Sequence, residues 1–85
     1  MISPGAVYGS ESVPILAGET ITLTGDIQIM QPSEEVRVWF GLDAGTEVST
    51  KGIKFPADGW VETWKYSKGT IKVYSAVATD LHVVR

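Results

Sequence analysis

The chain has 85 residues, no cysteine and a formal net charge of −3. This length suits one domain with one modest core, which buries roughly 60–65% of the unfolded surface. The lack of cysteine excludes disulfides and thiolate metal sites, and the negative charge argues against a nucleic-acid partner. No segment approaches the roughly 18 apolar residues of a membrane span, and residues 1–4 do not resemble a signal peptide. We therefore expect no membrane association, and synthesis in the cytoplasm without export.

Charge is distributed unevenly along the chain. Residues 1–50 carry seven acidic residues and one basic residue, whereas residues 51–85 carry six basic and three acidic residues. The favoured interpretation is mutual attraction between strands of one body. The alternative is a polar molecule that stacks head to tail on copies of itself, because summed charge bears on association and not on fold.

The first 30 residues predict an edge followed by a half-buried strand. Residues 1–12 contain Pro4, Gly5 and Gly9 without periodicity, which indicates an N-terminal arm or a short edge strand, and residues 13–85 then form a single domain. Residues 13–17 should form an edge strand, because Pro14 cannot donate to a ladder. Residues 20–30 alternate between apolar and polar side chains, which predicts one antiparallel strand interrupted at Gly25.

The middle of the chain predicts further short strands. Residues 35–42 alternate, with Phe40 among the apolar side chains of one face and Arg37 and Trp39 on the other. Residues 43–45 suit a hairpin loop, residues 46–50 and 52–55 suit short strands, and residues 56–59 suit a turn. Residues 60–66 predict a strand with Trp60 on its aromatic side. No segment shows the 3.6-residue period of a helix.

Residues 69–80 give the longest strand signal. They predict one central strand whose inward side carries Ile71, Val73, Ser75 and Val77, followed by a short closing strand over residues 81–85. The matched alternation of three predicted strands identifies a shared core: Ile21, Leu23, Val38, Phe40, Ile71 and Val73.

The strand pattern resembles that of bacterial immunoglobulin-like and fibronectin-type modules. Residues 18–25 look like their second strand, residues 36–40 like the third, and residues 69–80 and 81–85 like the last two. Ile71 stands where many relatives have a corner tyrosine, and the cysteine pair is absent. The resemblance implies an all-β, immunoglobulin-like antiparallel β-sandwich of about seven strands with a scaffold role. It implies no catalytic residue.

Catalytic and metal sites find little support in the sequence. Asp80 and His82 could be combined with Ser75 or Ser67 as a triad, but no nucleophile elbow surrounds either serine, so a surface pair is favoured. Loop carboxylates offer oxygen ligands for calcium without the alternating spacing of a dedicated loop: Glu34, Glu35, Asp43, Glu47 and Asp58. We expect no catalytic residue, no metal and no cofactor.

Aromatic residues are the best candidates for binding. Trp60, Trp64 and Tyr66 share one side of a predicted strand, with the two tryptophans roughly 13 Å apart. Core packing is favoured for them, ahead of a subunit interface and a glycan platform. Trp39 beside Arg37 suits a stacked pair or a protein contact.

These observations favour a non-catalytic structural or attachment module. A cysteine-free module of this size would suit a phage or viral virion, as a capsid decoration or a tail or fibre protein. Its partner would be another protein, such as a capsid or tail protein, or further copies of itself. The alternative is a carbohydrate-binding module that uses Trp60, Trp64 and Tyr66.

Overall fold

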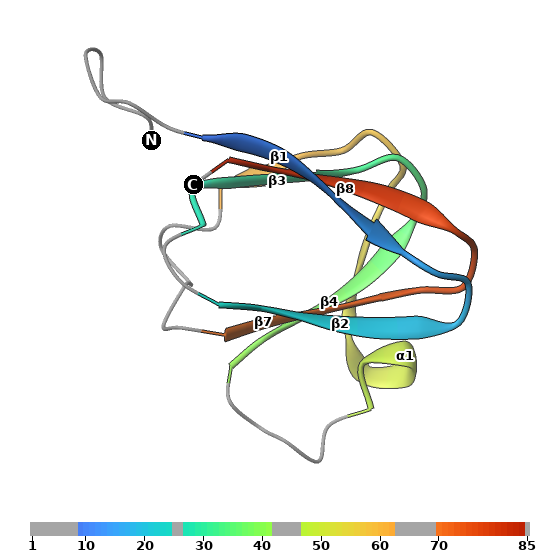
Figure 1. The fold of residues 1–85 in the computed structure, drawn as a ribbon. Coiled ribbons are helices and arrows are strands. Elements are labelled where there is room, and N and C mark those ends of the chain that lie inside the picture. Colours follow the sequence, from blue (N-terminus) through green and yellow to red (C-terminus); the bar gives the residue numbers. More distant parts are fainter. Residues whose placement is uncertain (1–8, 25–26, 42–46, 63–69, 85) are drawn as a thin grey trace.

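Eight strands form two four-stranded antiparallel sheets in the computed structural model, which describes residues 9–24, 27–41, 47–62 and 70–84. Figure 1 shows the sheets as two layers, with β1, β3 and β8 in one and β2, β4 and β7 in the other. Sheet A has the order β1 (Ser10–Ile15), β8 (Thr79–Val84), β3 (Ile29–Pro32) and β6 (Val61–Glu62). Sheet B has the order β2 (Glu19–Thr24), β7 (Thr70–Ser75), β4 (Val36–Phe40) and β5 (Ile53–Phe55). The predicted all-β antiparallel class is confirmed.

Strand pairing follows a nested order. The first strand pairs with the last, β2 with β7, β3 with β6, and β4 with β5. The chain therefore resembles one long hairpin that reverses its direction between β4 and β5. The hairpin is rolled up, so that the pairs β1–β8 and β3–β6 belong to sheet A and the pairs β2–β7 and β4–β5 belong to sheet B. Within sheet A the two pairs are joined because β3 also pairs with β8, and within sheet B they are joined because β4 also pairs with β7.

This order differs from that of immunoglobulin domains. In those domains the first two strands share one sheet, whereas β1 and β2 here lie in different sheets. The alternation of apolar residues indicates which side of a strand faces inward, but it does not specify the neighbouring strand. The resemblance to immunoglobulin-like modules thus stays a prediction, and the strand order counts against it.

The core lies between the sheets and uses side chains from both. Sheet B contributes Leu23, Val38, Ile71 and Val73, all buried, with Ile21 and Phe40 partly buried against them, so the predicted core is confirmed. Sheet A and its connections contribute the buried Ile15, Ile27, Met30, Leu81 and Val83. Burying a side chain of this kind stabilises the fold by about 1.5–3 kcal/mol.

The N-terminal edge strand lies where the sequence places it. Strand β1 is at the edge of sheet A, with Pro14 opposite Asp80 of β8. Proline lacks an N–H, so it is compatible with an edge position. The strand begins at Ser10 and so takes in residues 10–12, while residues 1–8 of the predicted arm lie outside the described part of the chain.

The prediction of one strand over residues 20–30 is wrong. Strand β2 ends at Thr24 in sheet B, and β3 begins at Ile29 in sheet A. The inward positions change from odd to even across this crossing: Leu23 and Ile27 are buried, then Met30 is buried while Ile29 is only partly so. Ile27 lies in the connection between β2 and β3 and packs into the core. Its apolar side chain continues the alternating pattern, so the two strands resemble one strand in the sequence.

The prediction of one strand over residues 69–80 is also wrong. Strand β7 ends at Ser75, and β8 begins at Thr79 in the other sheet. The Ser75 hydroxyl donates to the carbonyl of Val77, and such local bonds compete with strand pairing. Val77, expected inside, is half exposed. Both strands nevertheless take interior places in their sheets, as the apolar run suggests.

A short helix replaces the strand expected over residues 46–50. Helix α1 (Val48–Lys51) begins after Glu47, and the N–H of Gly52 donates to the carbonyl of Val48 at 3.0 Å. One turn is too short to show a helical period in the sequence. Val48 is buried, and α1 packs on β4 and β7, on the side of sheet B that faces away from sheet A (Figure 1).

Candidate functional site

The predicted binding residues do not form one cluster. Arg37 and Trp39 lie on β4, at the outward positions of sheet B. Trp60 lies directly before β6, at the edge of sheet A. Trp64 and Tyr66 fall outside the described residues. The structure thus brings Arg37 and Trp39 to one face and places Trp60 with the other sheet.

Arg37 holds helix α1 on the sheet. Its Nη1 donates to the carbonyl of Gly52 at 3.0 Å and lies 3.5 Å from the carbonyl of Thr50. Basic side chains near a helix C-terminus satisfy carbonyls that lack a partner within the helix. A Cβ on Gly52 would lie 2.6 Å from the Val48 carbonyl oxygen and 2.9 Å from Arg37 Cβ. The Arg37 guanidinium group therefore makes its hydrogen bond within the fold, at the end of α1.

Trp39 is partly covered. Its Nε1 is buried and has no hydrogen-bond partner within the described part of the chain. A Cβ on Gly41 would lie 3.6 Å from that nitrogen, and Gly41 has φ +143°, which favours glycine. Leaving such a donor unpaired costs about 1–3 kcal/mol. A covered indole suits packing better than an open stacking platform.

Trp60 is the exposed aromatic residue of the part of the chain that the structure describes, so the favoured prediction that it packs in the core is wrong. Its side chain is 62% exposed and follows the turn at residues 56–59, where Gly59 N–H donates to the Pro56 carbonyl at 3.1 Å, as the sequence predicts. The turn is attached to β3: Asp58 N–H donates to the Pro32 carbonyl at 2.8 Å, and Gln31 Nε2 donates to the Asp58 carbonyl at 2.9 Å. Trp60 therefore stands on an anchored turn.

Two exposed apolar residues, in the turns that adjoin β1 and β8, were not predicted from the sequence. Leu16 is 62% exposed in the β1–β2 turn and Val77 is 50% exposed in the β7–β8 turn. Gly18 N–H donates to the Ser75 carbonyl at 2.8 Å, which ties the turns together. Apolar residues in two turns, at positions 16–17 and 76–78, were the available signal, because turns favour polar residues and glycine.

A shallow hollow of about 200 Å³ adjoins these turns. Leu16 and Ala78 line it together with Ser33 and Asp80. Ser33 Oγ lies 3.1 Å from Thr79 Oγ1 and accepts from Asp80 N–H at 3.0 Å, so the polar side of the hollow is held in place. Apolar and polar groups thus meet at one end of the molecule, which suits contact with another molecule.

The residues considered for a triad face in different directions. Ser75 is buried on the inward side of β7, and its hydroxyl donates to Val77. Asp80 and His82 are exposed on the outward side of β8, in the other sheet. Ser67 lies outside the described residues. The structure does not bring Ser75 to the other two side chains.

The carboxylates considered for calcium are spread over separate connections. Glu34 and Glu35 lie between β3 and β4, Glu47 precedes α1, and Asp58 lies between β5 and β6. Asp43 is outside the described ranges. Within those ranges, no three histidine, cysteine, aspartate or glutamate side chains gather where they could hold a metal ion.

No protein family matches the chain, and neither the curated proteins nor the solved structures compared with it give a match. Among residues 9–24, 27–41, 47–62 and 70–84, no helix has the length and apolar character needed to cross a membrane.

Proposed function

We propose that the protein is a non-catalytic structural or attachment module of a phage or viral particle, as a capsid decoration or a tail or fibre component. The nested strand pairing carries the proposal. Eight strands paired in this order over two sheets have the arrangement of a jelly roll, an architecture that viral capsid domains use. Because fold alone does not define function, the contact surfaces supply the second line of support.

Exposed apolar residues give the module surfaces for a protein partner. Leu16 and Val77 are exposed on two turns that the hydrogen bond from Gly18 N–H to the Ser75 carbonyl links, and Trp60 is exposed at the edge of sheet A. Exposed apolar patches are typical of interaction sites, and tryptophan is enriched where interfaces concentrate their binding energy. Capsid or tail proteins are the partners that this role requires.

Particle incorporation tests the proposal. Gradient-purified particles from the source of the gene should contain the chain, as measured by quantitative mass spectrometry. Replacing Leu16 and Val77 together by serine should lower incorporation, because it removes the apolar contact surface, while the melting temperature stays within a few degrees. Replacing Ile53, an exposed apolar residue of β5, by serine is the control. Abundant chain in infected cells with none in particles would contradict the proposal.

Carbohydrate binding is the second candidate function, favoured by one observation. Trp60 is open on a turn that Gln31 helps to anchor, and lectin domains also use the jelly-roll arrangement. An aromatic ring beside polar side chains can stack on a sugar. Oligosaccharide titration should then give a saturable shift in tryptophan fluorescence that is lost in Trp60→Phe and kept in Trp39→Phe. A flat titration with a broad oligosaccharide panel would remove this candidate.

A further inference from the structure

Among the described residues, strand β2 is an open edge of sheet B that differs from the edge strands β1 and β5. Strand β1 carries Pro14, and β5 is only three residues long. Proline and short edge strands are common ways to block edge-to-edge pairing. Strand β2 has six residues without proline, lysine or arginine, so it keeps a regular edge that another strand can join.

We propose that β2 pairs antiparallel with β2 of a second copy of the chain, about a two-fold axis at Thr22. Every second residue of an edge strand turns its N–H and C=O groups away from its neighbour, and at Thr22 those groups would bond to Thr22 of the partner copy. The two B sheets would then continue as one eight-stranded sheet. The inference rests on the sheet edge and does not depend on a role in a virus particle.

Symmetry selects the register. Residues directly opposite in an antiparallel pair point to the same face, so a two-fold axis must pair residues of equal parity. An axis at Thr22 places Thr20 opposite Thr24 on the outward face and Ile21 opposite Leu23 on the core face. Threonine pairs and apolar pairs both stabilise neighbouring strands by roughly 0.2–1 kcal/mol.

The neighbouring register fits less well. An axis at Ile21 would place Glu19 opposite Leu23, a carboxylate against an apolar side chain. With the axis at Thr22, Glu19 lies outside the paired residues and no like charges face each other. Ile21 is only partly buried in a single copy, at the margin of the core. Pairing covers this side chain, so the second copy extends the core as well as the sheet.

Single-cysteine variants test the axis directly, because the chain has no cysteine of its own. Thr22 is the one position of β2 that would face itself, at a spacing that suits a disulfide. Under mild oxidation Thr22→Cys should crosslink at least about tenfold faster than Thr20→Cys, since pairing raises the effective concentration. Lys72→Cys, on the interior strand β7, is a second control. All three positions lie on the same outward face.

Sedimentation velocity of the unaltered chain gives an independent measurement. We expect concentration-dependent dimer formation, with the dissociation constant raised about fivefold or more by Thr22→Lys, which places two like charges opposite each other. Thr20→Lys should have a smaller effect, because its partner is a threonine. A chain that stays monomeric, with equal crosslinking of Thr22→Cys and Thr20→Cys, would overturn the proposal. Strand β2 would then be an edge that only a strand of another protein could join.

Discussion

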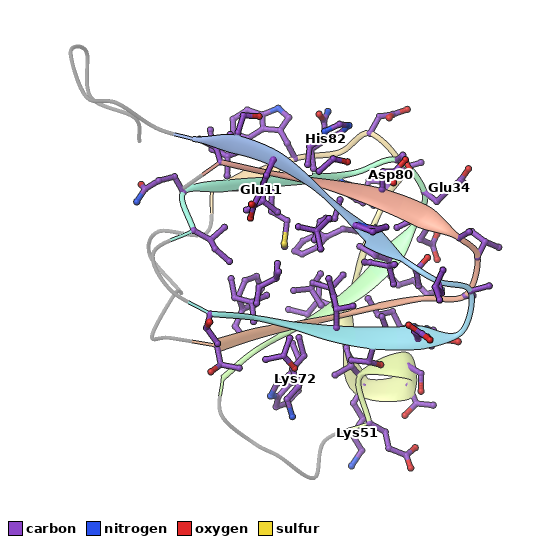
Figure 2. All side chains as sticks on the ribbon, in the orientation of Figure 1. Glu11, Glu34, Lys51, Lys72, Asp80 and His82 are labelled. Atoms are coloured by element: carbon purple, nitrogen blue, oxygen red, sulfur yellow. The ribbon has the colours of Figure 1, made fainter. Side chains whose placement is uncertain are left out.

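The two sheets have alike inner faces and unlike outer faces. Both supply buried aliphatic side chains to one core. The lysines and arginines of the described residues, Arg37, Lys51, Lys54 and Lys72, all belong to sheet B or to α1. Figure 2 shows Lys51 and Lys72 on the sheet B side and Asp80 and His82 on the sheet A side. Within the described ranges, the basic side chains thus lie on the sheet B side of the molecule.

The outer faces of the two sheets differ in what they contact. Sheet B uses its outer face internally: α1 packs on β4 and β7, and Arg37 bonds to the end of that helix. Sheet A has no such cover among the described residues, and its outward positions hold exposed polar groups such as Asp80 and His82. Changes at outward positions should therefore affect stability on sheet B and leave it nearly unchanged on sheet A.

The largest effect tests whether the sheets share the core equally. Leu81 of sheet A and Ile71 of sheet B are both fully buried on interior strands. Replacing either by alanine should lower the free energy of unfolding by about 2–5 kcal/mol, as measured by urea denaturation. Leu16→Ala, at an exposed position, should stay within about 0.5 kcal/mol. A loss below about 1 kcal/mol from one sheet alone would show that the two sheets do not share the core equally.

Gly52→Ala tests the close packing of α1 on sheet B. The added methyl group would lie 2.6 Å from the Val48 carbonyl oxygen, so the helix must shift. We expect a loss of about 1–3 kcal/mol in urea denaturation. Lys51→Ala, one residue earlier and exposed, is the matched control and should change little. Equal stability of both variants would show that α1 rests loosely on the sheet.

Arg37→Met removes the donor to the Gly52 carbonyl and keeps much of the aliphatic stem. The loss should be about 1 kcal/mol, the usual net value of one hydrogen bond. Lys54 lies opposite Arg37 on β5 and is exposed, so Lys54→Met removes a like charge without that bond. The two variants should differ in chemical denaturation, and an equal loss would assign the effect to charge alone.

Trp60→Phe should have the smallest effect on stability, within about 0.5 kcal/mol. It should nevertheless remove more of the acrylamide quenching of tryptophan fluorescence than Trp39→Phe does, because Trp60 is open and Trp39 is partly covered. The reverse order of quenching would place the accessible tryptophan on sheet B and invert the assignment of the two outer faces.

Sequence reasoning located the inward side chains well. The alternation at Val36 and Val38, and at Ile71 and Val73, matches their burial, because the two-residue period of a strand is a local property. The points where one strand ends and the next begins were harder to predict. The crossing near Ile27 and the turn after Ser75 carry apolar or small residues that continue the strand pattern, so the change of sheet leaves little trace in the sequence.

The candidate site was predicted only in part. Arg37 and Trp39 share a face as expected, whereas Trp60 is exposed and does not pack in the core as the favoured prediction had it. The role of Arg37 depends on α1, a single turn that has no recognisable period, and the apolar surface of Leu16 and Val77 depends on two turns that meet through sheet pairing. Both features come from contacts distant in sequence, which one sequence does not specify.

Nuclear Overhauser contacts between backbone protons report which strands are neighbours and so test the nested strand order. The nested pairing predicts contacts between β1 and β8, such as Ser12 with His82, and between β2 and β7, such as Ile21 with Val73. Assigned spectra of the 85-residue chain should contain both sets. Contacts that pair β1 with β2 in one sheet, as in an immunoglobulin arrangement, would contradict the nested strand order.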